Sequence, residues 1–269
     1  MHAKSKHPNL LQFDSWSKLV HVSNFSTTSQ GGVSGGNYAS FNLGRSTDDD
    51  PLNVQVNYRF LSRMLGIEIE NLYVPKQSHG DSIVVIDTNF LSQPSDQQEI
   101  ILTDVDALIT NVKNIGIGVT TADCVPILIY DPTKKALAAI HAGWRGTVQH
   151  IASKTLKKMQ QTYGTRPKEV LVGIAPSISA SRFEVGDEIG EAFREANYRL
   201  DSISYRNEAS GKLHIDLQEA NIIDLTSLGV ERNNIENSKL CSYSNPDLFF
   251  SARRQTIKSG RMMTGGVLI

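Results

Sequence analysis

The stretch CVPILIYDPTKKALAAIH, which runs from Cys124 to His141, decides the fold of this chain. It holds two apolar runs, residues 125–130 and 136–140, on either side of a turn cluster at 131–135. Two such runs joined by a turn predict an antiparallel β-hairpin. Because the outer ends of paired strands are neighbours, we expect Cys124 and His141 to lie together at the open end of the hairpin. A thiolate and an imidazole at that spacing can share one metal ion or one proton.

Further strands and helices are expected on both sides of the hairpin. Asp50 is a helix N-cap, Pro51 occupies the first helical position, and Gly66 ends the helix. The segment 92–99 is interpreted as a polar loop. Other helical patterns cover 147–163, 186–196 and 216–228, and β-rich runs cover 82–87, 107–110, 116–120 and 169–173. With no repeat and no low-complexity linker, these elements predict one mixed-sheet α+β or α/β domain over residues 1–269, with helices covering the sheet faces.

Composition limits the classes of partner. The chain has 269 residues, 39% of them hydrophobic, and a net charge of −1, so it can bury a full core and has no excess of positive charge. No basic block occurs, the first residues lack the apolar core of a signal peptide, and no run approaches the roughly 18 apolar residues of a membrane span. We therefore expect a cytoplasmic protein that acts on a small molecule and binds neither nucleic acid nor membranes. Two cysteines, Cys124 and Cys241, are too few for a disulfide framework.

A third candidate ligand, His79, lies in the segment PKQSHGD just before the strand expected at 82–87. With Cys124 and His141 it would provide two imidazoles and one thiolate, a set suited to tetrahedral Zn²⁺ with one position left for water or substrate. The long separations match no compact zinc-finger pattern, so the hairpin carries the argument. The alternative interpretations are a small buried cysteine and a hydrogen-bonded structural histidine.

Charged residues near these positions are candidates for supporting roles. Asp123 is a general acid or base, a group that orients a metal ligand, or simply a cap. Arg145, in a glycine-containing turn after His141, and the pair Arg253-Arg254 are candidates for holding a phosphate or carboxylate, the alternative being solvated surface arginines. The glycine-rich piece at 31–36 is interpreted as a turn. The remaining histidines are interpreted as solvated: His2, His7, His21, His150 and His214.

Several motifs together resemble the YfiH family. They are QSHGDS around His79, DVDALIT at 104–110, TADCVPILIYDP around Cys124, HAGWRGT from His141, and FFSARRQTIKSGRM from Phe249. Members were first labelled multicopper polyphenol oxidoreductases or laccases and later described as zinc-containing purine nucleoside phosphorylases with adenosine deaminase activity. The resemblance implies a single-domain α/β/β/α layered fold and a zinc ion held by the two histidines and Cys124. It also implies adenosine, inosine and methylthioadenosine as substrates.

For such a phosphorolysis, metal-ion and electrostatic chemistry suggest roles for individual residues. Phosphate would be held by zinc and Arg145, with Arg253 or Arg254, while Asp123 would supply a proton to the departing purine. Asn42, in the FNLG motif, would contact the ribose or the base. This chain departs from the family in having Ser29 where a basic residue is common. It also lacks family cysteines in 175–182 and at Ser244, which leaves the three inferred ligands unaffected.

Three other classes of protein would use these residues differently. A laccase needs a blue-copper centre and a copper cluster, and seven histidines, several of them near the chain's beginning, cannot provide these ligands. A metal-free hydrolase or amidase acting on a cell-wall precursor would use Cys124 as nucleophile and His141 as base. A non-catalytic regulator would hold a closed structural zinc and show no turnover.

Overall fold

The predicted hairpin lies at the centre of the molecule. The computed structural model describes residues 1–4 and 7–269. Strands β8 (Val125–Asp131) and β9 (Ala136–Ala142) pair antiparallel, with Pro126 opposite His141. The turn is stabilised by Asp131, whose side chain accepts hydrogen bonds from two backbone N–H groups of the turn, each 2.9 Å long. Cys124 directly precedes β8, so the hairpin prediction is confirmed.

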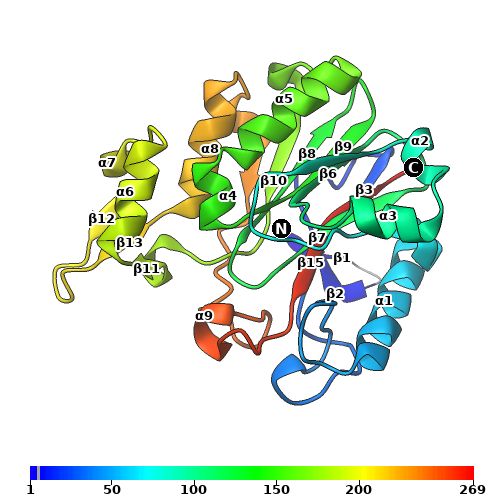
Figure 1. Cartoon of the computed structure of the whole chain (residues 1–269), viewed down its shortest axis with the longest axis horizontal. Coiled ribbons are helices and arrows are strands. Elements are labelled where there is room, and N and C mark those ends of the chain that lie inside the picture. Colours follow the sequence, from blue (N-terminus) through cyan, green and yellow to red (C-terminus); the bar gives the residue numbers. More distant parts are fainter. Residues whose placement is uncertain (5–6) are drawn as a thin grey trace.

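Two six-stranded sheets organise the chain (Figure 1). The hairpin sheet has the order β14-β10-β8-β9-β6-β5, and the terminal sheet, which holds both chain ends, has the order β1-β2-β3-β15-β7-β4. Both sheets are mixed, because the pairs β10–β14, β5–β6 and β4–β7 are parallel and the others antiparallel. The remaining strands of the hairpin sheet are β5 (Ile83–Ile86), β6 (Ala107–Thr110), β10 (Leu171–Ile174) and β14 (Ile235–Asn237). Those of the terminal sheet are β1 (His2–Lys4), β2 (His7–Gln12), β3 (Val22–Thr27), β4 (Leu72–Tyr73), β7 (Gly116–Thr121) and β15 (Met262–Leu268).

Helices cover the outer face of each sheet. In Figure 1, α5 (Ile151–Tyr163) and α8 (Leu217–Ser227) lie on one side of the strands and α1 (Pro51–Leu65) lies on the other. The layers are thus α/β/β/α, as the resemblance implied. A projecting lobe contains a small third sheet, β11-β13-β12, and two helices. Its elements are β11 (Glu184–Val185), α6 (Asp187–Glu195), α7 (Leu200–Ile203), β12 (Ser204–Arg206) and β13 (Leu213–Ile215). The other helices are α2 (Thr88–Leu91), α3 (Ser95–Ile101), α4 (Trp144–Val148) and α9 (Ala252–Gln255).

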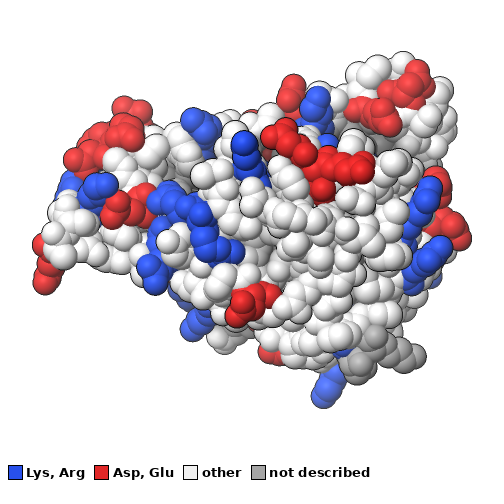
Figure 2. Space-filling model, turned by 90° about the horizontal axis from the view of Figure 1, so that it is seen from below, with Lys and Arg blue, Asp and Glu red and all other residues white. Residues whose placement is uncertain are grey.

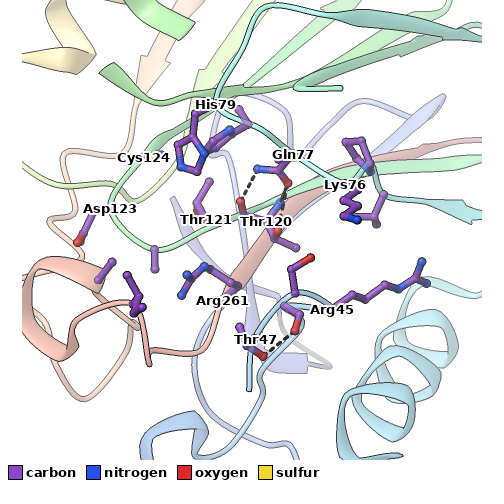
Figure 3. Close-up of a pocket in the computed structure, with 18 of the residues that line it drawn as sticks. Arg45, Thr47, Lys76, Gln77, His79, Thr120, Thr121, Asp123, Cys124 and Arg261 are labelled. Carbon is purple, nitrogen blue, oxygen red and sulfur yellow. Dashed lines mark hydrogen bonds between the residues drawn. The ribbon is translucent and has the colours of Figure 1, made fainter. Parts of the chain in front are cut away.

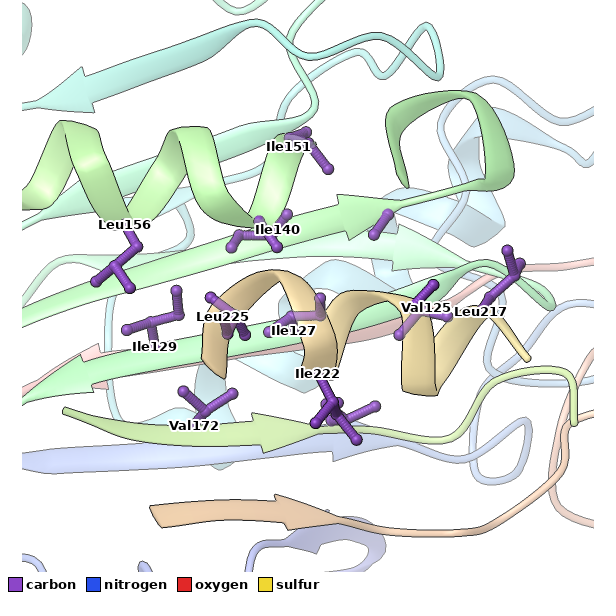
Figure 4. Packing of buried hydrophobic residues seen from close by; sticks show 14 of the residues in the cluster. Val125, Ile127, Ile129, Ile140, Ile151, Leu156, Val172, Leu217, Ile222 and Leu225 are labelled. Carbon is purple, nitrogen blue, oxygen red and sulfur yellow. The ribbon is translucent and has the colours of Figure 1, made fainter. Parts of the chain in front are cut away.

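The apolar run of β8 is continuous because both of its faces are buried. Successive side chains of a strand point to opposite faces. Val125, Ile127 and Ile129 therefore pack with residues of α5 and α8 (Figure 4), whereas Leu128 and Tyr130 pack between the two sheets. A third cluster joins α1 to the terminal sheet. The hairpin thus takes part in two of the three layer contacts, which is why this stretch decides the fold.

Replacing Leu128 with alanine should lower the free energy of unfolding by about 2–5 kcal/mol, because the side chain is fully buried between the sheets and truncation leaves a cavity. Urea unfolding followed by circular dichroism measures this loss. Leu52→Ala is the matched control, since Leu52 is 69% exposed on α1. Equal stability of the two variants would contradict the inter-sheet packing.

Some local predictions are confirmed and others are wrong. Asp50 caps α1 and Gly66 ends it in the left-handed conformation, as expected. The expected helix at 147–163 is broken into α4 and α5, because His150 has a φ of 58° between them. The polar segment 92–99 is not all loop: α3 begins at Ser95, in a sequence of good helix formers with Asp96 in its first turn.

Two histidines interpreted as solvated have structural partners instead. His150 makes hydrogen bonds with the Asp224 carboxylate, at 3.0 Å, and with the carbonyl oxygen of Ala196, also at 3.0 Å. His214 is buried, donates to the carbonyl oxygen of Ala180, and stacks on Tyr205 with ring centroids 5.1 Å apart. Both predictions failed because the partners come from segments distant in the sequence.

Charges of both signs share the surface. On the face drawn in Figure 2, Lys and Arg groups are interspersed with Asp and Glu groups, and neither sign covers the face continuously. None of the helices in the described ranges combines the length and apolarity needed to cross a membrane.

Candidate metal centre and its cavity

Three candidate ligands from separate segments converge at the open end of the hairpin. The ligating atoms of His79, Cys124 and His141 all lie within 4.8 Å of one another. The two imidazole rings are nearly perpendicular, with centroids 4.7 Å apart. His141 belongs to β9, Cys124 precedes β8, and His79 lies between β4 and β5 with a φ of 65°. Burial increases from the exposed His79 through Cys124 to the buried His141, so the group faces outward on the His79 side.

Asp106 holds this arrangement from behind. Its carboxylate, fully buried just before β6, bonds His141 Nδ1 at 2.7 Å and accepts hydrogen bonds from the backbone N–H groups of His79 and Gly80 at 3.0 and 2.8 Å. Burial opposes its charged form, but the hydrogen bond and charge of His141 and the backbone donors outweigh burial, so the Asp106 pKa is lowered. Because Nδ1 is bonded to Asp106, Nε2 of His141 is the nitrogen left to bind a metal ion together with His79 and Cys124. The same arrangement occurs in carboxylate–histidine–metal sites.

The charges of Cys124 and His141 are coupled. Burial disfavours the thiolate, but the charge of His141 and hydrogen bonds from both histidines outweigh burial and lower the Cys124 pKa to about 6. Burial also disfavours protonated His141, yet the Cys124 thiolate and Asp106 raise the pKa of His141 to about 9. In the absence of a metal, both shifts favour a thiolate–imidazolium pair. Metal binding must therefore displace the proton from His141.

Gly143 leaves the space that the three side chains need. A Cβ atom at this position would lie 3.1 Å from His79 Cδ2, 3.2 Å from Cys124 Sγ and 3.8 Å from His141 Cε1. The φ of Gly143 is −68°, which any residue adopts, so the requirement for glycine here is one of space and not of backbone conformation.

Replacing Gly143 with alanine should weaken metal binding roughly 10-fold, because the methyl group displaces two of the three ligands. Metal affinity is measured by competition with a chromophoric chelator. Gly35→Ala is the matched control: its φ is −116° and no heavy atom lies within 4 Å of the added carbon. Unchanged affinity in Gly143→Ala would show that the ligands do not need this space.

The group opens into a cavity of about 980 Å³. Its walls come from both sheets, the end of α3, the first residues of α9 and the loop after β3. In Figure 3, His79, Cys124 and Thr121 lie at one side of the cavity with the guanidinium of Arg261 below them, and Arg45 and Lys76 lie at the other side. Gln77 links two walls, because its side chain donates to the carbonyl oxygen of Thr120 and accepts from the Thr120 N–H, both at 2.8 Å.

Two of the other predicted site residues line the cavity. Asp123 is buried, with a φ of 92°, and its carboxylate accepts hydrogen bonds from the Ser242 and Ser251 hydroxyls and the Arg253 N–H, at 2.6, 2.9 and 2.6 Å. The guanidinium of Arg253 donates to the carbonyl oxygen of Glu184. Asp123 thus ties the turn before Cys124 to the start of α9.

Three predicted residues lie elsewhere. Arg145 is exposed, its guanidinium lies 4.5 Å from the centre of the Trp144 ring, and it is not part of the wall that the described residues form. Arg254 donates to the carbonyl oxygens of Ser242, Tyr243 and Phe249 and so fixes the local backbone. Asn42 is fully buried, bonded to Thr47 and Asp49. The predicted contacts of these three side chains with phosphate, ribose or base are not supported by their positions.

No role was predicted from the sequence for three residues that line the cavity or hold the candidate metal ligands in place. Asp106 and Arg261 both lie in quoted motifs, DVDALIT and FFSARRQTIKSGRM, but neither was given a role. Thr121 lies at the end of β7, one residue beyond the strand expected at 116–120, and in the quoted motif TADCVPILIYDP, but it was given no role. A signal existed for Asp106, a carboxylate directly before an apolar strand. Arg261 and Thr121 carried none, since their proximity depends on how β15 pairs with β7.

The donor set fits a metal ion with an open coordination position. Two imidazole nitrogens and a thiolate, one histidine oriented by a buried carboxylate, and a side open to a cavity are features of catalytic zinc sites. Within the described ranges this is the one group of three or more His, Cys, Asp or Glu side chains that could hold an ion. A second group that could serve a multicopper cluster is thus absent from the described residues.

Comparison with known proteins gives the same family as the motifs. Residues 23–268 match the family described as "Multi-copper polyphenol oxidoreductase laccase", and the chain belongs to this family. It is 43% identical over 261 residues, 97% of each chain, to a protein of Bacteroides thetaiotaomicron named "Purine nucleoside phosphorylase". It is 44% identical over 245 residues, 91% of this chain and 93% of the other, to "Adenosine deaminase RL5" from an unknown prokaryotic organism. The crystal structure of the Bacillus licheniformis protein YfiH superposes with a TM-score of 0.89, at 27% identity, over 99% of this chain and 98% of that chain.

Proposed function

We propose that the protein is a zinc-dependent purine nucleoside phosphorylase, with residues 1–269 forming one catalytic domain and adenosine, inosine and methylthioadenosine as its substrates. The observation that carries this proposal is the convergence of His79, Cys124 and His141 at the wall of a 980 Å³ cavity. Pockets for small ligands span about 300–1,000 Å³, so this one has room for a nucleoside and a phosphate together. The relative named a purine nucleoside phosphorylase supports the same reaction.

Phosphorolysis breaks the bond between the ribose C1′ and the purine N9 and forms a bond from C1′ to a phosphate oxygen. The electron pair of the broken bond stays on the purine, and the proton of hydrogen phosphate ends on the purine nitrogen. Zinc held by the three ligands would supply positive charge that stabilises negative charge on nearby oxygen atoms. The cavity walls hold the two substrates side by side and limit water around them.

Asp123 is better suited to positioning than to proton donation. Three donors bond its carboxylate oxygens, and protonating either oxygen would cost one of these hydrogen bonds. We infer that Asp123 fixes the turn that carries Cys124, and that Arg253, which shares this network, borders the substrate at the opening of the cavity.

The proposal is tested by incubating the zinc-loaded protein with each nucleoside, with and without inorganic phosphate, and separating the products by chromatography. Free base and the sugar 1-phosphate should form in equal amounts, and only when phosphate is present. Nucleosides that stay intact under all these conditions would overturn the proposal.

A deaminase activity at the same centre is a second candidate, favoured by the relative named an adenosine deaminase. In this reaction water replaces the 6-amino group of adenosine and releases ammonia and inosine. The same assay detects it as inosine and ammonia formed from adenosine without phosphate.

A metal-free cysteine hydrolase or amidase acting on a cell-wall precursor is the rival that the thiolate–imidazolium pair favours. The rival predicts a purified protein without metal, alkylated rapidly at Cys124 by iodoacetamide. The zinc proposal predicts one equivalent of zinc that protects Cys124 and is lost in Cys124→Ser.

A further inference from the structure

Arg261 reaches into the cavity beside the candidate metal centre. It directly precedes β15, and the pairing of Met262 with Thr121 places it across from the turn that leads to Cys124. Figure 3 shows its guanidinium on the side of the cavity where Thr121, Asp123 and Cys124 lie, away from Arg45. The side chain is thus near the centre although at least 120 residues of sequence separate it from every candidate ligand.

The Arg261 side chain is fixed before any ligand arrives. Its backbone N–H donates to Asn42 Oδ1 at 2.8 Å, and its Nη1 donates to Ser259 and Gly260 at 2.6–3.0 Å. Gly44 makes room for its stem, because a Cβ there would lie 2.7 Å from Arg261 Cγ. All the guanidinium hydrogen bonds that the structure describes use Nη1, so Nε and Nη2 keep their donors for the cavity.

The charge of Arg261 is not balanced by an ion pair. None of the salt bridges within residues 1–4 and 7–269 involves it. Burial disfavours its charged form and outweighs the favourable charges of Cys124 and Asp123, so its pKa is lowered. The other cavity cations, Arg45, Lys76 and Arg253, are exposed to water. A partly buried cation without a counter-ion gains most from an anionic ligand.

Thr121 provides a second, independent sign of a ligand. It is 2% exposed and lines the cavity, and its hydroxyl has no hydrogen-bond partner in the described part of the chain. Buried polar side-chain atoms nearly always have a partner, and an unsatisfied one calls for an explanation such as a bound group. An oxyanion between Arg261 and Thr121 would satisfy this hydroxyl.

We propose that Arg261 and the Thr121 hydroxyl form the subsite for inorganic phosphate, next to the group of His79, Cys124 and His141. This proposal rests on the proposed function for the identity of the anion and deepens it by assigning the phosphate. Arg261 donates from Nε and Nη2 to two phosphate oxygens, and Thr121 donates to a third or to one of the same two. The subsite serves phosphorolysis alone, because deamination uses water and no phosphate.

The test compares Arg261→Gln, Arg261→Lys and Thr121→Val with the unchanged protein. In Arg261→Gln the KM for phosphate should rise roughly 10- to 100-fold, and in Thr121→Val about 3- to 10-fold, because charged and neutral hydrogen bonds are lost respectively. The KM for inosine should rise much less than the KM for phosphate, because the lost contacts are to the anion. Arg261→Lys should recover only part of the phosphate affinity, since an ammonium lacks the planar fork.

Equilibrium dialysis of the zinc-loaded protein with radiolabelled inorganic phosphate gives a readout that needs no turnover. Arg145→Gln is the matched control, since Arg145 lies outside the cavity wall, and its phosphate affinity should not change. Unchanged phosphate affinity in both Arg261→Gln and Thr121→Val, with the fold intact by circular dichroism, would overturn the subsite. Phosphate binding that is lost in these variants, in a protein that splits no nucleoside, would keep the subsite and overturn the proposed function.

Discussion

Replacing His141 with alanine is expected to remove bound metal and to abolish phosphorolysis and any deamination together. His141 contributes one of three ligands and, through its Nδ1, the link from the centre to Asp106. With two ligands left, a tetrahedral zinc site loses most of its affinity. Metal content is measured by plasma mass spectrometry and both reactions by chromatography of the products.

The matched control for this variant is His214→Ala, which also removes a buried histidine, but one bonded to Ala180 in the projecting lobe. It should keep one equivalent of zinc and full activity per folded molecule. A His141→Ala protein that is free of metal and still forms ribose 1-phosphate would show that the centre has no part in phosphorolysis.

Replacing Asp106 with asparagine should weaken zinc binding about 10- to 100-fold, the usual cost of losing a group that orients a metal ligand. The amide lacks the charge that favours the present orientation of His141, and its NH₂ group cannot accept from the backbone of the His79 segment. The zinc affinity is measured by competition with a chelator of known strength.

Asp131→Asn is the control for Asp106→Asn. Asp131 is equally buried and accepts two backbone hydrogen bonds, where Asp106 accepts three, but it lies in the turn at the opposite end of the hairpin. The Asp131→Asn variant should have a lower free energy of unfolding and an unchanged affinity for zinc. Equal zinc affinities in the two variants would contradict the orienting role of Asp106.

The predictable parts of the fold depend on residues that are close together in the sequence. The hairpin was predictable because two apolar runs flank a turn whose Asp131 bonds the following backbone, and α1 was predictable from its cap, Pro51 and Gly66. The break between α4 and α5 was not predicted: it falls at His150, which has a φ of 58° and whose ring bonds Asp224, in α8.

The same distinction holds for the site. Cys124 and His141 were found from the hairpin alone, whereas the pairing of β15 with β7 brings Arg261 to the cavity from the far end of the chain. Asn42 and Arg254 are the opposite case. Both belong to motifs of the family, yet their polar atoms are engaged within the protein, Asn42 ordering the backbone of Arg261 and Arg254 that of residues 242–249. A motif identifies residues that matter and does not say whether they contact substrate.

We propose that phosphorolysis needs one zinc ion at His79, Cys124 and His141. The most direct measurement is a titration of the metal-stripped protein with zinc, following ribose 1-phosphate formed from inosine and phosphate. Activity should be absent at the start, rise linearly and stop rising at one equivalent of zinc per chain. Full activity of the stripped protein in the presence of a strong chelator would contradict the claim.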